Sequence, residues 1–275
     1  GSIACYKAVD LASKLVQAGA LVDVVMSYGA TRFVTPLAFR AITHREVVTD
    51  GFEAGSEFGN EHVALAQRAD IIAIAPATVH CIAKLALGLA DDPLTTTVVA
   101  AKAPLLVAPA MDGNMYDHPA TQENLAKLSE RGAVIAGPAP GRLSSGLVGM
   151  GRFLEPIELI GYIAATLGRD GDLAGRTVVV SAGGTMEAID PVRVITNHSS
   201  GRMGYALAEA ARDRGAKVVL VAAPTGLPDP PLVQVVRVKS AQEMCDAVLG
   251  HLEGAGALIM AAAVADYRPA NESAQ

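Results

Sequence analysis

The sequence predicts an α/β protein made of two doubly wound units, each with a mostly parallel sheet. Its 275 residues are enough for two domains of about 150 residues each. Predicted strands and helices alternate along the chain, which is typical of parallel sheets joined by crossover helices. Hydrophobic residues make up 51% of the chain and aromatic residues only 4%, which suits helices packed closely on buried parallel strands.

The first unit is predicted from short apolar runs, which indicate buried strands, and from longer amphipathic segments, which indicate helices. Strands are expected at residues 21–26, 71–75, 104–108 and 133–136. Helices are expected at residues 4–18, about 31–39, 82–87, 94–102 and 121–131, and a polar loop precedes the strand at 71–75. This order of elements predicts one doubly wound unit.

Residues 137–152 contain many glycines and two prolines. The segment has too many of these residues for a regular element and is long for a connector, so we expect a functional flap. A helix at 156–167 follows, and then the polar, glycine-rich stretch 168–172. We therefore expect the domain boundary near residue 170, with domains at 1–170 and 171–275.

The second unit begins in a Rossmann-like way, with a strand, a glycine loop and a helix. Its strands are expected at 176–181, 217–222, 233–238 and 257–262, and its helices at 204–214 and 241–252. The chain opens on Gly1 and Ser2, a pair that ordinarily finishes a strand-to-helix turn, and residues 271–275 are polar where a further element is expected. We therefore expect truncation at both ends, with the first strand lost and the second sheet incomplete.

Bulk properties exclude several classes of protein. The net charge of −6 provides no basic field for nucleic acid. The apolar runs are shorter than the roughly 20 residues that span a bilayer, so no membrane segment is expected. The three cysteines Cys5, Cys81 and Cys245 are widely spaced and have no CxxC companion. They indicate neither a disulfide framework nor a zinc site, and they fit a reducing cytoplasm.

Candidate binding residues follow the predicted strands, since ligands of open parallel sheets lie at the carboxyl ends of the strands. Ser181-Ala-Gly-Gly-Thr185 follows a strand, and its small residues let the backbone approach a phosphate. A glycine-rich turn alone is a weak signal and leaves phosphate binding open. The turn also lacks the spaced glycines of the dinucleotide fingerprint, which argues against an NAD-dependent oxidoreductase.

A second polar stretch, at residues 196–204, comes directly before a predicted helix. It places Asn197, the hydroxyls of Ser199 and Ser200, and two glycines, Gly201 and Gly204, at the helix start. An elaborate amino-terminal cap is the alternative interpretation, but a cap needs one such residue and this stretch has four polar ones. We therefore favour an anion cradle.

In the first unit, residues 75–78 and 109–115 each follow a predicted buried strand. Both turns are therefore expected to line one crevice at the carboxyl ends of the strands. His62 lies just ahead of Val63 and Leu65. A lone histidine is more often a surface or capping residue than a catalytic one, so its role stays open on this ground.

Short motifs in both units carry a family resemblance. The first unit contains Gly1-Ser-Ile-Ala-Cys-Tyr-Lys7, His62-Val-Ala-Leu65, Ala75-Pro-Ala-Thr78, Ala90-Asp-Asp92, and Pro109-Ala-Met111 with Met115. These motifs closely resemble those of flavin-binding cysteine decarboxylases. The second unit contains Asp190-Pro-Val-Arg193, Asn197-His-Ser-Ser-Gly201 with Met203-Gly204, and Ala262-Ala-Val-Ala-Asp-Tyr-Arg-Pro269, which look like those of phosphopantothenate-cysteine ligases. In this order, on one chain, they resemble the bacterial bifunctional phosphopantothenoylcysteine decarboxylase/phosphopantothenate-cysteine ligases of coenzyme A biosynthesis.

For the first unit, the resemblance implies a flavodoxin-like domain that binds FMN and decarboxylates 4'-phosphopantothenoylcysteine to 4'-phosphopantetheine. Flavin is needed because removal of CO₂ from an ordinary cysteine would leave an unstabilised carbanion. His62 falls on the family's catalytic histidine and would transfer a proton during oxidation of the substrate. The FMN-binding residues implied by position are Gly1, Ser2, Ser27, Thr78, Ala90, Asp91 and Asp92.

Two catalytic positions depart from the decarboxylase pattern. Asp112 stands where the family usually has Asn, and Ser145 stands where many members have a proton-donating Cys in the flap. An ionised Asp112 would repel the substrate carboxylate unless it is protonated or Asn114 takes over the contact. A serine hydroxyl is also a poorer acid than a thiol. Two alternatives stay open: an active decarboxylase, and a nonenzymatic FMN-binding scaffold with a decayed site.

For the second unit, the resemblance implies a ligase that uses CTP as co-substrate and Mg²⁺ to join 4'-phosphopantothenate to cysteine. The reaction passes through an acyl-cytidylate, which Asn197 would hold as a catalytic residue. The CTP-binding residues implied by position are Gly183, Gly184, Ser199, Ser200, Gly201, Ala262, Ala263 and Asp266. The metal ligands stay unassigned. Family members carry a lysine-rich loop past the position of Gln275, so poor turnover is expected of this chain.

The resemblance also implies the partners of the chain. They are the small-molecule substrates 4'-phosphopantothenate, cysteine and 4'-phosphopantothenoylcysteine, with no nucleic acid and no membrane. Family members assemble their decarboxylase domains as trimers and their ligase domains as dimers, which together give a dodecamer. A cytoplasmic homo-oligomer is therefore expected.

Overall fold

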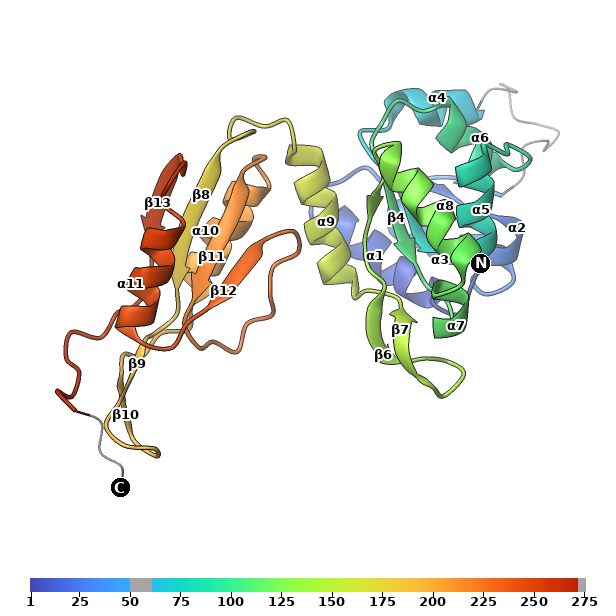
Figure 1. The fold of residues 1–275 in the computed structure, drawn as a ribbon. Helices are drawn as coiled ribbons and strands as arrows, with labels where there is room; N and C mark the ends of the chain where they lie inside the picture. The colour runs from blue at the N-terminus through green and yellow to red at the C-terminus, as the bar shows by residue number, and fades with distance from the viewer. Residues whose placement is uncertain (50–60, 272–275) are drawn as a thin grey trace. The chain divides into compact units, whose positions relative to one another are not determined.

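The computed structural model describes residues 1–49 and 61–271 (Figure 1). Contacts within the chain divide it into a first unit at Gly1–Thr166 and a second at Leu167–Gln275. Residues 50–60 of the expected polar loop and residues 272–275 of the expected polar end lie outside the described residues. The expected loop is wrong where the structure has the strand Val47–Val48 and the helix Glu61–Arg68. In the described part of the chain, no helix is long and apolar enough to cross a membrane.

A parallel sheet of three strands, in the order β3-β4-β5, forms the centre of the first unit. The strands are β3 (Ile72–Ala77), β4 (Leu105–Pro109) and β5 (Val134–Ile135). β3 and β4 are near-continuous apolar runs, as is typical of strands covered on both faces. A separate parallel pair joins β1 (Val24–Val25) to β2 (Val47–Val48).

Nine helices belong to the described part of the first unit, and one expected helix is wrong. Because Pro36 fixes its own φ and has no N–H, it begins a helix after the N-cap Thr35, and the single helix expected at 31–39 does not form. The helices are α1 (Cys5–Gln17), α2 (Tyr28–Thr31), α3 (Pro36–Thr43), α4 (Glu61–Arg68), α5 (Val79–Leu87), α6 (Pro93–Ala100), α7 (Gly113–Tyr116), α8 (Pro119–Glu130) and α9 (Pro156–Gly168).

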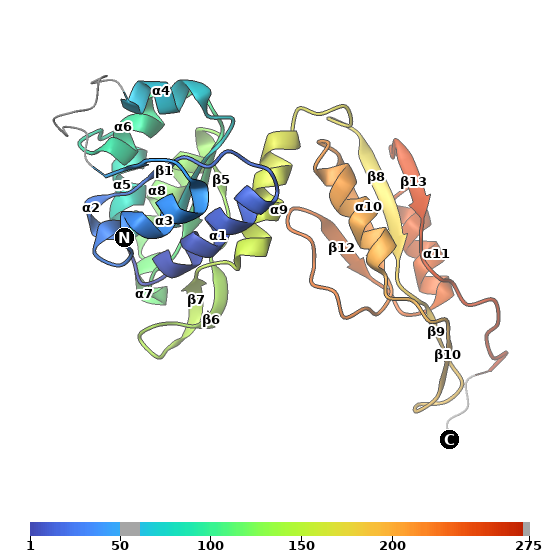
Figure 2. The ribbon, with the colours of Figure 1, turned by 180° about the vertical axis from the view of Figure 1, so that it is seen from behind.

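Helices cover both faces of the β3-β4-β5 sheet. Leu106 of β4 packs in one apolar cluster with Leu11 of α1 and Leu159 of α9. Its neighbour Val107 packs in another cluster with Leu125 of α8. Since successive strand residues point to opposite faces, α1 and α9 cover one face and α8 the other, as the two opposite views indicate (Figures 1 and 2). The first unit is therefore doubly wound.

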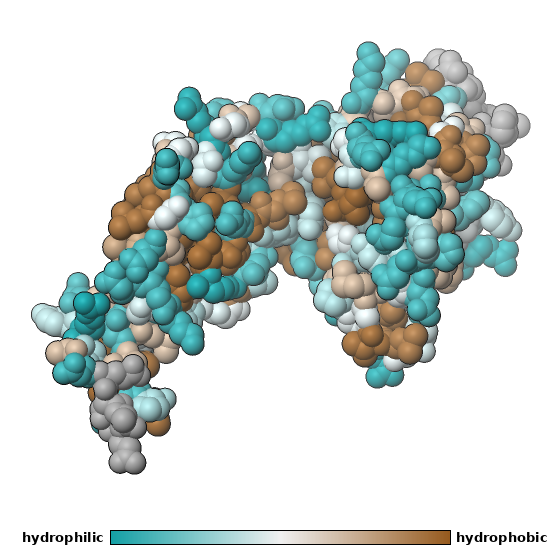
Figure 3. Space-filling model, in the orientation of Figure 1, coloured by the Kyte–Doolittle hydropathy of each residue, from teal (hydrophilic) through white to brown (hydrophobic). Residues whose placement is uncertain are grey.

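Residues 137–152 form a β-hairpin, so the expectation that their glycines and prolines exclude a regular element is wrong. β6 (Ala139–Arg142) pairs antiparallel with β7 (Val148–Arg152). Gly151 has a φ of +134°, and a β-carbon on it would stand 2.2 Å from the carbonyl oxygen of Met111. Glycine thus allows the hairpin to lie directly on the turn after β4. Leu147 and Val148 of the hairpin are exposed, and a hydrophobic patch is visible at this end of the unit (Figure 3).

The second unit contains a four-stranded, fully parallel sheet in the order β12-β11-β8-β13. Counted along the chain, this order is third, second, first, fourth, so the direction of winding reverses between β8 and β13. The strands are β8 (Thr177–Ala182), β11 (Lys217–Ala222), β12 (Gln234–Arg237) and β13 (Ala257–Met260).

Two helices cover this sheet, α10 (Arg202–Arg212) and α11 (Ala241–Gly250). Val180 of β8 packs in a cluster with Tyr205 of α10, whereas its neighbour Val179 packs in a cluster with Met244 of α11. The alternation shows that the two helices lie on opposite faces. The predicted fold class, two doubly wound α/β units with mostly parallel sheets, is confirmed.

A short antiparallel hairpin in the second unit was not predicted. It consists of β9 (Met186–Ala188) and β10 (Val194–Thr196). The Asp190 carboxylate accepts the N–H groups of Val192 and Arg193 at 2.9 and 2.7 Å and so closes the turn between the two strands. Three-residue strands give almost no period-2 pattern, which explains why the sequence did not indicate them.

Candidate functional site

The carboxyl ends of β8 and β13 lie where the winding of the second sheet reverses. Three segments with predicted nucleotide-binding residues meet there: residues 181–185 at and beyond the end of β8, 196–201 at and beyond the end of β10, and 261–266 after β13. A reversal of this kind leaves a crevice outside the strand ends, where doubly wound folds bind ligands. The fold thus brings residues far apart in the sequence to the edge of the sheet suited for binding.

Glycines allow these three segments to approach one another closely. A β-carbon on Gly184 would lie 2.6 Å from the carbonyl oxygen of Asn197 and 3.5 Å from the β-carbon of Ser199. A β-carbon on Gly201 would lie 3.5 Å from the Cα of Gly183. Gly183 and Gly201 also have φ values of +85° and +72°, which L side chains rarely adopt. The glycines are therefore required for this arrangement.

Hydrogen bonds attach residues 261–263 to the end of β8 and to the turn that follows it. The buried Ser181 Oγ accepts the N–H groups of Ala261 and Ala262, each at 3.2 Å. The N–H of Ala263 donates to the carbonyl of Gly183 at 2.8 Å. The backbone around Ala262 and Ala263 is thereby fixed at the crevice.

Asn197 is bound to the same segment. Its side-chain Nδ2 donates to the carbonyl oxygen of Val264 at 2.9 Å. The other polar candidates are less constrained: Ser200 accepts only a long 3.5 Å hydrogen bond from the N–H of Arg202. Asp266 is exposed and forms no hydrogen bond with another described residue. Asn197 is therefore the polar candidate with the best-defined orientation.

In the first unit, Gly1 and Ser2 lie next to the start of α2. A β-carbon on Gly1 would stand 2.3 Å from the carbonyl carbon of Gly29, so the two backbones are in direct contact. Ser2 Oγ accepts the N–H of Ala4 at 3.2 Å. Ser27 is the N-cap of α2, and its hydroxyl makes no capping hydrogen bond. Two short turns with two hydroxyls are thus brought together.

The turns after β3 and β4 lie side by side, as predicted. The N–H of Ala110 donates to the carbonyl of Ala77 at 3.0 Å. Thr78 is the N-cap of α5, and its Oγ1 accepts the N–H of Cys81 at 3.3 Å. The capping bond fixes the side chain of Thr78 at the carboxyl end of the sheet.

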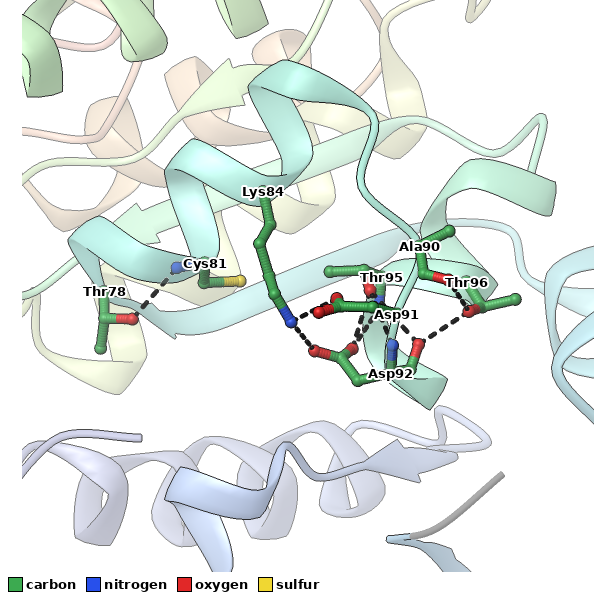
Figure 4. A network of polar contacts seen from close by, with 8 residues as sticks. All are labelled: Thr78, Cys81, Lys84, Ala90, Asp91, Asp92, Thr95 and Thr96. Atoms are coloured by element: carbon green, nitrogen blue, oxygen red, sulfur yellow. Dashed lines mark hydrogen bonds and ion pairs between the residues drawn. The ribbon is translucent and has the colours of Figure 1, made fainter. Parts of the chain in front are cut away.

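A lysine connects α5 to the predicted flavin-binding turn at residues 90–92 (Figure 4). Lys84 Nζ lies 2.5 Å from Asp91 Oδ1 and 2.6 Å from Asp92 Oδ2, and its side chain is only 12% exposed. Asp92 also caps α6, because its Oδ1 accepts the N–H of Thr95 at 2.8 Å. Both acidic side chains therefore point to Lys84, and the turn itself is held against α5.

The charges of this network alter the ionisation of its members. Hydrogen bonds with Asp91 and then Asp92 raise the pKa of Lys84 above its ordinary 10.5. Burial by itself would raise the pKa of Asp92, but the Lys84 ammonium and the hydrogen bonds from Thr95 outweigh it and hold that pKa below 3.8. Lys84 and Asp92 are consequently both charged at neutral pH.

The two unusual decarboxylase positions contact each other. Ser145, in the loop between β6 and β7, donates its hydroxyl to Asp112 Oδ2 at 2.6 Å. Asp112 Oδ1 accepts the N–H of Asn114 at 3.2 Å, which makes Asp112 the N-cap of α7. The N–H of Met111 donates to the carbonyl of Gly151 at 3.0 Å. The hairpin is therefore attached to the turn after β4 through both Ser145 and Gly151.

His62 lies on α4, which packs against α6. In the described part of the chain, its side chain forms no hydrogen bond, and so none joins it to Asp112 or to residues 75–78. Its helix is anchored at the far end, where Asp23 pairs with Arg68 at 2.8 Å and with Arg45 at 2.5 Å. The structure thus places His62 beside α6 without joining it to the other candidates.

Comparison with known proteins assigns each unit to a family. Residues 1–168 match the family described as Flavoprotein. Residues 173–275 match the family described as DNA/pantothenate metabolism flavoprotein C-terminal domain. The "Coenzyme A biosynthesis bifunctional protein CoaBC" of Vibrio vulnificus (strain YJ016) is 48% identical over 275 residues, covering 100% of this chain and 68% of that protein. The chain belongs to the CoaBC family. The predicted family of bifunctional enzymes of coenzyme A biosynthesis is therefore confirmed.

Solved structures resemble the first unit of this CoaBC family member. A PPC decarboxylase mutant complexed with pantothenoylaminoethenethiol has a TM-score of 0.53 and 30% identity, covering 59% of this chain and 91% of that one. "The FMN binding protein AtHal3" has a TM-score of 0.51 and 29% identity, covering 59% of this chain and 90% of that one. The fold predicted for the first unit is thus shared with both proteins.

For some of the residues that organise the two sites, no role was predicted. Lys84 lies in the last turn of α5, seven and eight residues before Asp91 and Asp92, and no motif surrounds it. Ser181 and Thr185 flank the predicted glycines, and both are fully buried. A hydroxyl on each side of a glycine turn that follows a buried strand could have indicated their role, because a buried hydroxyl needs a hydrogen-bond partner.

Proposed function

We propose that the chain joins 4'-phosphopantothenate to cysteine in its second unit and decarboxylates the resulting 4'-phosphopantothenoylcysteine in its first. Membership of the CoaBC family supports both halves of the proposal. The observation that carries it is the meeting of Gly184, Asn197 and the segment 261–266 at the reversal point of the second sheet. Nothing in the sequence order of these segments requires that they meet.

FMN is proposed as the cofactor of the first unit. The matched flavoprotein family and the resemblance to an FMN-binding protein support it. The residues also fit: the close contact of Gly1 with Gly29 brings the backbones of two turns together, and Ser27 has a hydroxyl without a capping bond. Thr78 and the turn Ala90, Asp91 and Asp92 would hold the remainder of the cofactor.

For decarboxylation, bound FMN supplies a reversible electron acceptor, so that CO₂ can leave without an unstabilised carbanion. The chain's own residues would handle protons. His62 is proposed to accept a proton during oxidation, and Ser145 to donate one after CO₂ has left. Asp112 would hold the Ser145 hydroxyl, and the hydrogen bonds from Ser145 and Asn114 offset the negative charge that faces the substrate carboxylate.

The second unit is proposed to use CTP together with Mg²⁺. The described residues contain no group of three His, Cys, Asp or Glu side chains that could hold a metal ion. Mg²⁺ commonly binds through substrate phosphates and retains several waters, so we propose that it enters as the CTP complex. Gly183, Gly184, Ser199, Ser200 and Gly201 would approach the phosphates with backbone N–H groups and hydroxyls.

In the ligation, the carboxylate of phosphopantothenate would attack the α-phosphate of CTP and release pyrophosphate. The amine of cysteine would then displace CMP from the acyl-cytidylate. Ala262, Ala263 and Asp266 are proposed to contact the cytidine, and Asn197 to hold the acyl-cytidylate with the amide groups that Val264 leaves available. Such contacts to a reaction intermediate accelerate the chemical step more than they aid substrate binding.

Pyrophosphate release tests the ligase half. The chain is incubated with phosphopantothenate, CTP and Mg²⁺, and Asn197→Ala is compared with the unaltered chain. We expect a loss of roughly 10²-fold, as for removal of one donor to a developing charge. His198→Ala, an exposed neighbour, serves as the control. Equal rates for the Asn197 variant and the unaltered chain would reject the assignment.

Carbon dioxide release distinguishes an active decarboxylase from a nonenzymatic flavoprotein scaffold. The protein is loaded with FMN, which should produce the visible spectrum of a bound flavin, and 4'-phosphopantothenoylcysteine is added. Release of CO₂ with a bound flavin supports the enzyme. A bound flavin without CO₂ supports the scaffold, and failure to bind FMN rejects both.

The location and assembly of the protein follow the same proposal. We propose a cytoplasmic homo-oligomer in which decarboxylase units form trimers and ligase units form dimers. The exposed apolar side chains Tyr6, Tyr28 and Leu37 in the first unit, and Val192 and Met260 in the second, support contacts with other copies. The mass of the assembly, measured by light scattering, checks the proposed dodecamer.

A further inference from the structure

One peptide group of the second unit is bound between two side chains. The N–H of Ala265 donates to Thr185 Oγ1 at 2.8 Å. The carbonyl of the same peptide, that of Val264, accepts from Asn197 Nδ2 at 2.9 Å. Because a peptide group is planar and its N–H and C=O point in opposite directions, the hydrogen bond on one side fixes the direction of the other.

Thr185 is well placed to act as the fixed partner. It is 0% exposed, and its backbone is bound as well: its N–H donates to the Ala263 carbonyl at 3.2 Å, and its carbonyl accepts the Thr196 hydroxyl at 2.8 Å. Thr185 therefore joins the loop after β8 to the end of β10 and to the segment after β13. These are the three segments that form the crevice.

Asn197, in contrast, lies on an exposed stretch and depends on its partners for orientation. Its amide nitrogen faces Val264 because the partner there is a carbonyl oxygen, which only the NH₂ end of an amide can satisfy. Its Oδ1 accepts no hydrogen bond from another described residue, and its second N–H is likewise available to a ligand. The direction of both groups is set by the Val264–Ala265 peptide.

We propose that Thr185 is a positioning residue that orients Asn197 for ligation through the Val264–Ala265 peptide. The inference rests on the proposed ligase function of the second unit. Without the Thr185 hydroxyl, the N–H of Ala265 loses its acceptor, and the peptide can rotate to find water. The Val264 carbonyl then leaves Asn197, whose amide no longer meets the reacting groups.

Thr185→Val removes the hydroxyl while keeping the shape of the side chain, and Thr185→Ser keeps the hydroxyl. Pyrophosphate release in Thr185→Val is expected to fall roughly 10- to 100-fold in kcat, with the KM for CTP changed by less than about threefold, since misplacement of a reacting contact lowers the chemical step. Thr185→Ser should restore most of the rate. Thr166→Val is the matched control, since Thr166 is also buried and, among the described residues, its hydroxyl bonds only to the Tyr162 carbonyl of its own helix.

A double-mutant cycle separates orientation of Asn197 from general stability. If Thr185 acts through Asn197, adding Thr185→Val to Asn197→Ala lowers the rate by less than about twofold further. Amide hydrogen exchange gives a reading independent of activity, because the Ala265 N–H should exchange at least about tenfold faster in Thr185→Val than in the unaltered chain. Thr185→Ala gives the same expectations if the valine variant does not fold.

The inference is overturned if Thr185→Val keeps the full rate, if its loss adds in full to that of Asn197→Ala, or if Ala265 exchange is unchanged. The hydrogen-exchange result stands even if the unaltered chain releases no pyrophosphate. A failure of the ligase proposal can therefore be told apart from a failure of the role given to Thr185.

Discussion

The candidate sites of the two units are held together by different forces. In the first unit, acidic side chains and a lysine make the main contacts. Lys84 forms ion pairs with Asp91 and Asp92, and Asp112 accepts a hydrogen bond from Ser145. In the second unit, the contacts are neutral, made by buried hydroxyls, one amide and glycines packed backbone against backbone. Each arrangement is sensitive to a different kind of change.

A site held by charges should respond to pH and to loss of one partner, because the other charge is left without compensation. A site held by neutral groups and close backbone contacts should be insensitive to pH but intolerant of added volume. Variants that change one charge, one proton donor or one methyl group therefore test the comparison directly.

The largest effect is expected at Ser145. Ser145→Ala removes the proposed proton donor, and loss of a general acid costs roughly 10²- to 10⁴-fold in rate. CO₂ release from 4'-phosphopantothenoylcysteine measures this rate, and the affinity for FMN should not change. The neighbouring exposed Ser144→Ala is the control. If Asp112 acts by holding Ser145, Asp112→Ala and Ser145→Ala together lose little more than Ser145→Ala alone, and full additivity would contradict the pairing.

A second, smaller effect is expected from one added methyl group in the second unit. In Gly184→Ala, the new β-carbon would meet the Asn197 carbonyl oxygen at 2.6 Å, so one of the two segments must shift. A displacement of about 1 Å is expected to lower pyrophosphate release roughly 10²-fold. Gly226→Ala is the matched control, since no atom lies within 4 Å of its added β-carbon. FMN binding by the first unit should not change.

The smallest effect is expected at Lys84. Lys84→Met leaves Asp92 without its ammonium partner, and we expect a loss of about 1–2 kcal/mol in unfolding free energy with weaker FMN binding. Thermal unfolding and flavin titration measure the two quantities. Lys14→Met, which removes an exposed pair with Asp10, should cost less than about 0.5 kcal/mol. Equal losses in the two variants would show that the network at residues 90–92 has no special role.

The stabilisation by Lys84 should also have a defined pH window. Because the pKa of Asp92 in the folded chain lies below 3.8, its contribution is present above pH 3.8 and is lost as the pH falls through the lowered value. Because the pKa of Lys84 is raised above 10.5, its contribution is present below pH 10.5 and is lost as the pH rises through the raised value. The stability difference between the unaltered chain and Lys84→Met should therefore be constant between these limits. The effect of Gly184→Ala on unfolding should show no such window.

Much of the fold could be predicted from the sequence because its main elements are long and strongly patterned. The strand at 217–222 is predicted and found at the same residues, because a lysine followed by five apolar residues is typical of a buried strand with one exposed end. The helix around Pro36 was predicted wrongly because a proline occurs both just after a helix and at the first position of one. Here Thr35 is the N-cap, so Pro36 begins a helix. The hairpin at 139–152 was missed because its glycines serve close packing on Met111, which no local pattern reports.

The candidate sites were predicted only in part, for the same reason. The residues next to strand ends, such as Gly184 and Asn197, could be placed because parallel sheets deliver their loops to one edge. Lys84 acts on Asp91 and Asp92 across the turn that follows its own helix. Ser181 and Thr185 act through partners about 80 residues away, and such pairing depends on the complete fold. The contact between Asp112 and Ser145 is also of this kind, although each residue alone was singled out.

The strand order of the second unit has a consequence for how its site is assembled during synthesis. β13 emerges last among the four strands of the sheet but pairs with β8, which emerges first. The crevice therefore has only one wall until β13 has left the ribosome, and the slow, long-range pairing of β13 with β8 adds the second wall. A nascent chain that has made β8, β11 and β12 still lacks the segment 261–266 that lines the other side of the crevice.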